Sequence, residues 1–463
     1  MSDSSHRPHG KELMLATLRH ETPGAVPWVP FAGVHAGKLR GFSALEVLQQ
    51  PAKLLEALLA VHQLYDPDGQ PVIFDLQVEA EILGCELAWA PFAPPSVVSH
   101  PLETRLELPK HLPEPDEGRL PMILETMRKM KEMVGEQTAL YGLICGPMTL
   151  ASHLRGTDIF MDTFDHPDFL QALIGYCRDV NLRMAELFRQ AGMDVIAVVD
   201  PVVSQVSPRH FKQYLLQPFS EIFRAIRQMG AYSSFFVCGD ATKNLEWMCQ
   251  TAPDSISVDE NIHLPTAREI TERYNIVIGG NIPLTTCMLL GTQQDNMKYV
   301  VDLLERLGAI DGMDTFRNFI LAPGCDMPYD TPVENTVAVV QAVRDPVTTR
   351  SMLANYESHT FDLDVTLPDY SRLEKPLIEV FTLDSDTCAA CGYMLGAARR
   401  AVESLNGQVD LVEYKFTRPE NVARIKKMGV KNLPSLYING ELKYSSIIPG
   451  NRELLEAIRQ VMR

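Results

Sequence analysis

Residues 235–240 read FFVCGD and residues 319–326 read FILAPGCD, so two apolar stretches each reach a cysteine with an aspartate close behind. Both stretches are short and nearly all apolar, which predicts strands buried on both faces. In a barrel of parallel strands the C-terminal ends converge on one mouth, where the active site lies. Two thiolates delivered there, by Cys238 and Cys325, would make half of a zinc site. The sequence therefore predicts metal-assisted chemistry, provided that the two sulfur atoms meet.

Strand-like and helix-like segments alternate from about residue 10 to residue 345. Alternation over this length predicts a parallel α/β fold, and the length fits a (β/α)8 barrel of the TIM type better than an open sheet. The candidate strands are Pro71–Phe74, Ala139–Ile144, Val195–Val199, Ser234–Val237, Ser255–Val258, Ile276–Ile278 and Phe319–Leu321. The candidate helices between them include Leu170–Gln190, His210–Met229 and Asn296–Leu307.

A second domain follows the predicted barrel of residues 1–345. Residues 346–374 are polar and without a period, so they predict a linker or a strap laid over the barrel. Residues 375–463 have the order strand, CxxC, helix, strand, helix, proline, hairpin and helix, with the hairpin turning at Asn439-Gly440. This order resembles the thioredoxin fold, in which Pro434 takes the place of the cis-proline that faces the CxxC.

The CxxC of this domain is Cys388 to Cys391, at the start of a predicted helix. The positive end of the helix dipole favours the thiolate of the first cysteine. Cys388 is therefore expected to attack and Cys391 to resolve, with Pro434 contacting the redox substrate. Asp384 and Asp386 lie just upstream and oppose this effect. The alternative is half of a metal site, or two thiols without a chemical role.

Composition excludes several functional classes. Hydrophobic residues make up 46% and charged residues 22% of the 463 positions, as in a globular protein of more than one domain. The net charge of -17 argues against nucleic acid as a partner, because binding a phosphate backbone needs a basic surface. No apolar run is long enough to span a membrane, and the polar N-terminus does not resemble a signal peptide. We therefore expect a cytoplasmic protein that binds neither nucleic acid nor membrane.

The chain has nine cysteines, an odd number in a long sequence without an export signal. Such a pattern argues against a disulfide framework and favours metal binding or redox chemistry. Several of these thiols are expected to be ordinary core residues.

Five motifs identify a family for the first domain. They are GPMTLA at 146–151, DPVVSQVSPRHF at 200–211, CGDAT at 238–242, GGNIP at 279–283 and APGCDMP at 322–328. In this order they resemble the uroporphyrinogen decarboxylase superfamily and, within it, the cobalamin-dependent methyltransferases, including the methylcobamide:coenzyme M enzymes. The resemblance spans roughly residues 10 to 345 and implies a (β/α)8 barrel with a zinc ion held by a His-x-Cys motif and a distant cysteine.

The zinc site that the resemblance implies is incomplete in this chain. Cys238 and Cys325 match the two cysteines, but Phe236 stands at the histidine position, and a phenyl ring cannot bind zinc. Carboxylates bind zinc together with thiolates and would make it a harder Lewis acid. The candidates for the third ligand are Glu79, Glu81, Asp200 and Asp240, with Glu79 and Glu81 expected on one face of a strand-like or loop segment.

The resemblance implies a corrinoid-dependent methyltransferase. Zinc would assist the transfer of a methyl group between a small substrate, a thiol or a methyl ether, and cobalamin. No cobalamin-binding domain is visible in the sequence, so the corrinoid is expected on a partner protein. Asp200 and Asp240 are the candidate catalytic residues of the barrel, and Glu79 and Asp200 the candidate substrate-binding residues. The second domain would keep the barrel thiolates reduced or act on a redox partner.

Two other functions stay open. A uroporphyrinogen-type decarboxylase needs several cations for the substrate carboxylates, yet residues 28–37, where the family has an arginine-rich signature, contain no arginine. Alternatively the barrel is a degenerate scaffold, as Phe236 hints, and the protein is a thiol–disulfide oxidoreductase. Two structural readings also compete with the site: Asp200 could cap the next turn, and His35, His153 and His210 could be core or surface residues.

Overall fold

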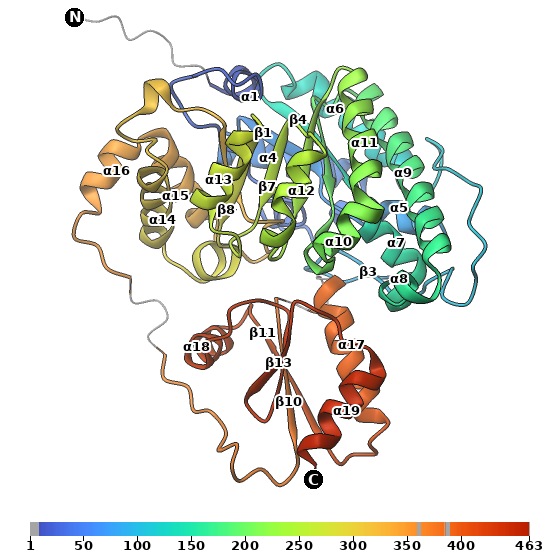
Figure 1. Ribbon diagram of the computed structural model, residues 1–463. Coiled ribbons are helices and arrows are strands. Elements are labelled where there is room, and N and C mark those ends of the chain that lie inside the picture. Colours follow the sequence, from blue (N-terminus) through green and yellow to red (C-terminus); the bar gives the residue numbers. More distant parts are fainter. Residues whose placement is uncertain (1–8, 359–362, 384, 386–388, 463) are drawn as a thin grey trace, which may run out of the picture. The chain divides into compact units, whose positions relative to one another are not determined.

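The computed structural model describes residues 9–358, 363–383, 385 and 389–462, and the chain divides into two compact units after Ser358 (Figure 1). The first unit contains a parallel sheet in the order β1-β4-β5-β6-β7-β8-β9. Its strands are β1 Gly69–Ile73, β4 Ala139–Cys145, β5 Val195–Val199, β6 Tyr232–Val237, β7 Ser255–Val258, β8 Val277–Ile282 and β9 Phe319–Pro323. All seven overlap the predicted strands, and the predicted TIM-like α/β fold is confirmed.

The N-terminal segment closes the curled sheet between β9 and β1. Leu321 donates its backbone N–H to Pro27 O at 2.9 Å, and Val29 donates to Leu321 O at 3.0 Å. On the other side, Asp68 donates its N–H to Trp28 O at 3.0 Å. Residues 27–29 therefore take the eighth position of the barrel, although only one isolated bridge, Trp28 to Leu321, counts as strand pairing.

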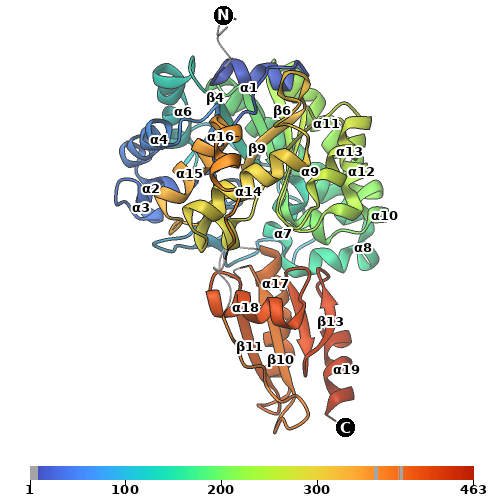
Figure 2. The same cartoon turned by 90° about the vertical axis from the view of Figure 1, so that its left-hand side faces the viewer.

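Helices surround the barrel, as Figures 1 and 2 show. The longer ones are α1 Lys11–Leu18, α4 Pro51–Tyr65, α6 Leu120–Val134, α7 Pro147–Arg155, α9 Pro167–Gln190, α11 Leu216–Gln228, α13 Leu264–Arg273, α14 Gln293–Arg306 and α15 Val333–Arg344. The shorter ones are α2 His35–Lys38, α3 Ala44–Gln49, α5 Val78–Ile82, α8 Asp162–Asp165, α10 Pro208–His210, α12 Leu245–Gln250 and α16 Pro346–Met352. A small hairpin pairs β2 Leu87–Ala88 with β3 Ser96–Val97. None of the helices in the described ranges is long and apolar enough to cross a membrane.

Two predicted boundaries differ from the structure. The single helix predicted for 210–229 is broken, because Phe211–Leu215 forms a π-helical turn between α10 and α11. The predicted linker, residues 346–374, is partly taken up by the two units. Its first part forms α16, and a later residue, Val365, accepts a hydrogen bond from Lys427 Nζ of the second unit at 2.7 Å.

Aromatic side chains fill the barrel interior. The ring of Phe236 is fully buried and lies 4.7 Å from the ring of Phe31 and 5.8 Å from that of Phe74, measured between centroids. The rest of this core comes mainly from alternate residues of the strands, together with Met14 and Leu18 of α1, while a larger core lies between the sheet and the helices. Cys238 and Cys325 pack against the interior cluster.

The second unit has a four-stranded sheet in the order β11-β10-β12-β13, with β10 and β11 parallel and the other pairs antiparallel. Its elements are β10 Leu377–Thr382, α17 Ala389–Glu403, β11 Asp410–Lys415, α18 Pro419–Met428, β12 Ser435–Ile438, β13 Glu441–Ser445 and α19 Asn451–Val461. The peptide bond Leu433–Pro434 is cis, and Asn439 and Gly440 both have positive φ, 51° and 77°. The predicted thioredoxin-like order is therefore confirmed.

Candidate active site

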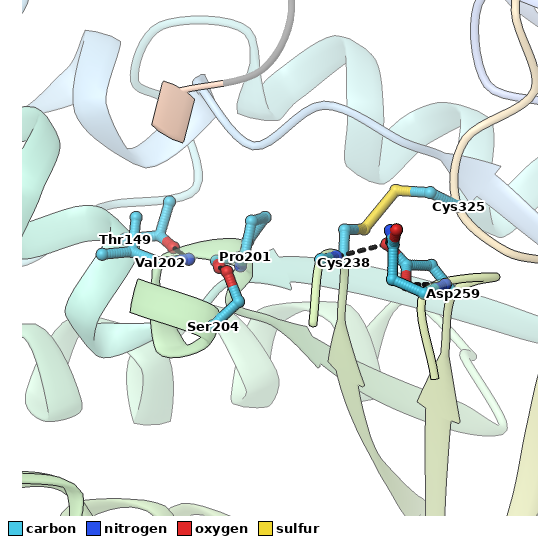
Figure 3. The surroundings of a disulfide bond; sticks show 9 residues. Thr149, Pro201, Val202, Ser204, Cys238, Asp259 and Cys325 are labelled. Carbon is cyan, nitrogen blue, oxygen red and sulfur yellow. Dashed lines mark hydrogen bonds between the residues drawn. A yellow bond between two sulfur atoms is a disulfide. The ribbon is translucent and has the colours of Figure 1, made fainter. Parts of the chain in front are cut away.

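The structure brings the two barrel cysteines together, and it bonds them to each other. Cys238 directly follows β6 and Cys325 follows β9, and their sulfur atoms form a disulfide with the Cα atoms 6.2 Å apart (Figure 3). Both residues are partly exposed. The prediction that these sulfur atoms meet is correct. The odd cysteine count argued against disulfides, but strand ends that converge on one mouth can join cysteines that are 87 residues apart.

A glycine and an aspartate shape the turn after Cys238. Gly239 has φ +87°, and a Cβ there would lie 2.8 Å from Ser204 Oγ, so both the conformation and the space favour glycine. The N–H of Gly239 donates to Asp259 Oδ2, next to the disulfide in Figure 3. Asp259 directly follows β7 and also accepts the N–H of Asn261 at 2.9 Å. Burial raises the pKa of Asp259 to about 6.

Two more carboxyl groups lie at this mouth, those of Glu260 and Asp326. The sequence reasoning quoted Asp326 as the acid after Cys325 without giving it a role, and it did not mention Glu260. A Cβ on Gly324 would lie 2.5 Å from Glu260 Oε2, so only glycine permits this close approach. Glu260 accepts the N–H of Leu284 at 3.4 Å, and burial together with the nearby Asp259 charge raises its pKa to about 8. Asp326 accepts the N–H of Gly33 at 2.8 Å, and burial raises its pKa well above the ordinary value. The sequence signal that could have found Glu260 is its position, because Asp259 and Glu260 directly follow β7 and the strand ends meet at the mouth.

Asp200, predicted as a catalytic and substrate-binding residue, caps α7. Its Oδ2 accepts the N–H of Met148 at 2.8 Å, and its Oδ1 accepts Thr149 N–H at 3.1 Å and Thr149 Oγ1–H at 2.6 Å. The side chain is fully buried, and burial raises its pKa to about 7. Figure 3 shows Thr149 beside the turn after Asp200, and Ser204 of this turn lies against Gly239, next to Cys238. These hydrogen bonds give Asp200 a structural role at the start of α7. Its side chain does not cap the next turn, Pro201–Gln205, as the alternative expected.

Glu79 and Glu81 lie in helix α5, and not on one face of a strand-like or loop segment as expected. Residues two apart on a helix point in different directions, which explains why their surroundings differ. Glu79 is buried and accepts the N–H of Cys145 at 2.9 Å, and burial raises its pKa to about 8. Glu81 instead accepts the Nε–H of Arg119 at 2.7 Å.

Arg119 is a buried cation that no sequence motif marked. It donates to Asp75 at 2.5 Å and to Glu81 at 2.7 Å, and its guanidinium lies 5.0 Å from the ring of Trp89. Two carboxylates already neutralise this charge. Arg119 is mostly buried and bonded to these two carboxylates, so it gives no support to the decarboxylase alternative.

The residues as arranged do not fit a zinc ion. Within the part of the chain that the structure describes, no group of three or more His, Cys, Asp or Glu side chains is placed to hold a metal. The two sulfur atoms are bonded to each other, and Phe236 at the third ligand position packs into the aromatic core. Asp240 accepts the N–H of Thr242 at 3.0 Å, and Glu79 accepts the backbone N–H of Cys145.

The second candidate site is the CxxC of the C-terminal unit. Cys391 is buried in α17, and its Sγ accepts the N–H of Leu383 at 3.4 Å. Cys388 lies outside the described residues. Pro434 is buried and directly precedes β12. The role of these three residues remains a prediction.

Comparison with known proteins places both units. The family model "Uroporphyrinogen decarboxylase (URO-D)" matches residues 9–346, and the model "Thioredoxin domain" matches residues 377–459. The chain is 27% identical over 345 residues to "Methylcobamide:CoM methyltransferase MtbA" of Methanosarcina acetivorans, covering 72% of this chain and 97% of the relative. It is 30% identical to "Methylcobamide:CoM methyltransferase MtaA" of Methanosarcina barkeri, over 64% of this chain and 85% of the relative.

Solved structures and further relatives agree with this placement. The solved "methyltransferase from Methanosarcina mazei" has a TM-score of 0.65 at 26% identity, covering 72% of this chain and 98% of that one. A "Uroporphyrinogen decarboxylase" of Wolbachia pipientis is also related, at 26% identity over 65% of this chain. The expectation of an enzyme of the methyltransferase type is confirmed by these relatives. The chain thus belongs to the uroporphyrinogen decarboxylase (URO-D) family and carries a thioredoxin domain at its C-terminal end.

Proposed function

We propose that the barrel transfers a methyl group between a small thiol or methyl ether and the cobalamin of a partner corrinoid protein. The observation that carries this proposal is the extent of the match, because residues of this barrel cover 97% of a methylcobamide:CoM methyltransferase. The mouth of the barrel, where Cys238, Glu260 and Cys325 are partly exposed, is the place for the reaction.

Glu260 is the residue that we propose for proton transfer at this mouth. With a thiol substrate, the ionised carboxylate takes the S–H proton, the sulfur attacks the methyl carbon, and the cobalt–carbon electron pair stays on cobalt. With a methyl ether, cobalt(I) takes the methyl group, and the protonated Glu260 gives its proton to the departing oxygen. A pKa of about 8 leaves both forms populated near neutral pH, as proton transfer in both directions requires.

Zinc, which the family resemblance implies, has no step in this proposal because the arranged residues do not fit it. If zinc bound, it would act as a Lewis acid on the substrate oxygen or sulfur. Whether Cys238, Cys325 and Glu79 bind zinc after reduction stays a prediction.

The test is a methyl-transfer assay with the full chain, prepared anaerobically. Methylcobalamin and 2-mercaptoethanesulfonate serve as donor and acceptor, and the loss of methylcobalamin is followed by its absorbance. We expect enzyme-dependent turnover that falls at least about 100-fold in Glu260→Gln, a typical loss for a general acid–base residue. Glu269→Gln on the exposed face of α13 is the matched control and should keep full activity. Absence of turnover with this thiol and with methyl ethers would refute the proposed reaction.

A second activity is proposed for the C-terminal unit, which is thiol–disulfide exchange by Cys388 and Cys391. The thioredoxin match over residues 377–459 supports it. Exchange is measurable as reduction of a protein disulfide, independently of methyl transfer.

A further inference from the structure

We propose that Cys238 and Cys325 form a reversible disulfide that opens and closes across the barrel mouth by exchange with dithiols. The bond is present in the structure and links the end of β6 to the end of β9. Two other strands, β7 and β8, lie between these two in the sheet. The bond therefore spans the mouth from strand to strand, and is not a staple within one loop. This inference does not depend on methyl transfer.

The pair differs from every other described cysteine. Six further cysteines are described, and all six are buried: Cys85, Cys145, Cys177, Cys249, Cys287 and Cys391. Burial raises the pKa of Cys85 and of Cys249 to about 12, so these thiols stay protonated and inert at neutral pH. Only Cys238 and Cys325, among the described cysteines, combine partial exposure with a sulfur partner.

Both cysteines of the pair are partly exposed at the mouth, where a reductant can reach them. Each has a glycine neighbour, Gly239 or Gly324, which lets Ser204 or Glu260 pack close to the backbone beside the sulfur atoms. The nearby carboxyl groups are held by the backbone: Asp259 by the N–H of Gly239 and Asp326 by the N–H of Gly33. The aromatic core under Phe236 closes the inner side, so a reductant would approach from the mouth.

The exchange balances with a dithiol as the reductant. One thiolate of the dithiol attacks a sulfur of the pair, a mixed disulfide forms, and the protein S–S bond breaks with its electron pair leaving on the other cysteine. The second thiol of the dithiol then breaks the mixed disulfide. The protein ends with two thiols, having gained two electrons and two protons, and the dithiol ends as a disulfide. The two forms differ at the mouth, because only the reduced form has free sulfur ligands or nucleophiles.

Thiol mapping on the full chain tests this proposal. The double variant Cys388→Ser/Cys391→Ser removes the CxxC pair of the C-terminal unit. The remaining pair that is placed to form a disulfide is then Cys238 with Cys325. The folded protein is treated anaerobically with dithiothreitol or with diamide, which takes up the two electrons and two protons. It is then denatured, alkylated with iodoacetamide and measured by intact mass and peptide mapping. We expect two fewer alkylated cysteines after diamide, at 238 and 325, and full recovery with dithiothreitol.

Further variants fix the assignment. In the same background Cys238→Ser and Cys325→Ser should each abolish the two-thiol difference, whereas the buried Cys249→Ser should keep it. The proposal is overturned if the pair stays reduced in diamide, or if dithiothreitol cannot open the bond in the folded protein. It is also overturned if the reduced protein holds about one equivalent of zinc that blocks oxidation, since the cysteines would then be metal ligands. None of these readouts uses the methyl-transfer assay, so failure of either proposal leaves the other standing.

Discussion

The two units of this protein build a cysteine pair in opposite ways. In the C-terminal unit, Cys388 and Cys391 are three positions apart in the sequence, and Cys391 lies in the first turn of α17. In the barrel, Cys238 and Cys325 are 87 residues apart, and only the closed sheet makes them neighbours. A pair so close in the sequence does not depend on distant parts of the chain. The barrel pair depends on every strand between β6 and β9, so its chemistry reports on the fold as a whole.

The largest expected effect separates the two pairs by function. Cys388→Ser should abolish reduction of a protein disulfide, because the attacking thiolate is gone, and should leave methylcobalamin turnover unchanged. Insulin reduction and the methylcobalamin assay measure the two activities on the same preparation. Loss of both activities would mean that the barrel depends on the CxxC for turnover.

Matched core truncations show whether the units fold independently. Phe236 and Phe381 are both fully buried phenylalanines, one in each unit. Phe236→Ala and Phe381→Ala should each lower the free energy of unfolding by about 3–5 kcal/mol, the usual cost of such a cavity. Denaturant unfolding followed by hydrogen exchange assigns the loss to one unit. If each variant destabilised both units equally, the two would unfold as one.

Acid should destabilise the barrel before the C-terminal unit. His35 is fully buried, its ring nitrogens lie 2.7 Å from Tyr65 Oη and 3.0 Å from Tyr329 O, and burial lowers its pKa to about 4. Its folded-state pKa is below the ordinary value of 6.5, so protonation favours the unfolded chain. Stability is complete above pH 6.5 and is lost as the pH falls toward 4, by about 2 kcal/mol at pH 5.

The C-terminal unit of the same chain is the control for this pH effect. The C-terminal unit has one histidine, His359 at its first position, and residues 360–463, which contain all of its described helices and strands, have none. No buried histidine in these elements therefore causes such a loss. His35→Gln should make the stability of the barrel fall less between pH 7.5 and 5 than in the wild type, measured by urea unfolding at each pH. If the stability of the barrel fell equally with pH in wild type and variant, protonation of His35 would not be the cause of the loss.

The smallest effect concerns the cap of α7. Asp200→Ala should lower the stability of the barrel by about 1–2 kcal/mol, because the N–H groups of Met148 and Thr149 lose their acceptor. Asp240→Ala is the control, since it removes a single bond, from Thr242, at a partly exposed turn. Thermal unfolding measures both. A larger loss for Asp240 would contradict the assigned cap.

The sequence predicted elements better than contacts. The strand predicted at Val195–Val199 matches β5 at both ends, because a buried parallel strand is one unbroken apolar run. Residues 27–29 were not predicted to complete the barrel, since they contribute only an isolated bridge. Glu260 was missed for another reason. Its place just after β7 was a signal that the sequence reasoning did not use, whereas its contact with Gly324 is a tertiary contact that no local pattern encodes.

The predicted site residues divide in the same way. Cys238 and Cys325 could be paired from sequence because each sits at a strand end. Asp200 looks the same in sequence, as an acid directly after a strand, but its neighbour is the start of α7 and not the cysteines. Strand ends show which side chains reach the mouth, and only packing decides which of them meet.

The closure of the barrel by residues 27–29 sets an order of events during synthesis. The segment around Trp28 leaves the ribosome early, and its partner Leu321 is made almost at the end of the first unit. Until then the early segment has no strand on one side, and the nascent sheet has an open edge. The barrel cannot be completed while the chain is still growing through its middle, so closure falls to the last moments of translation or to the released protein.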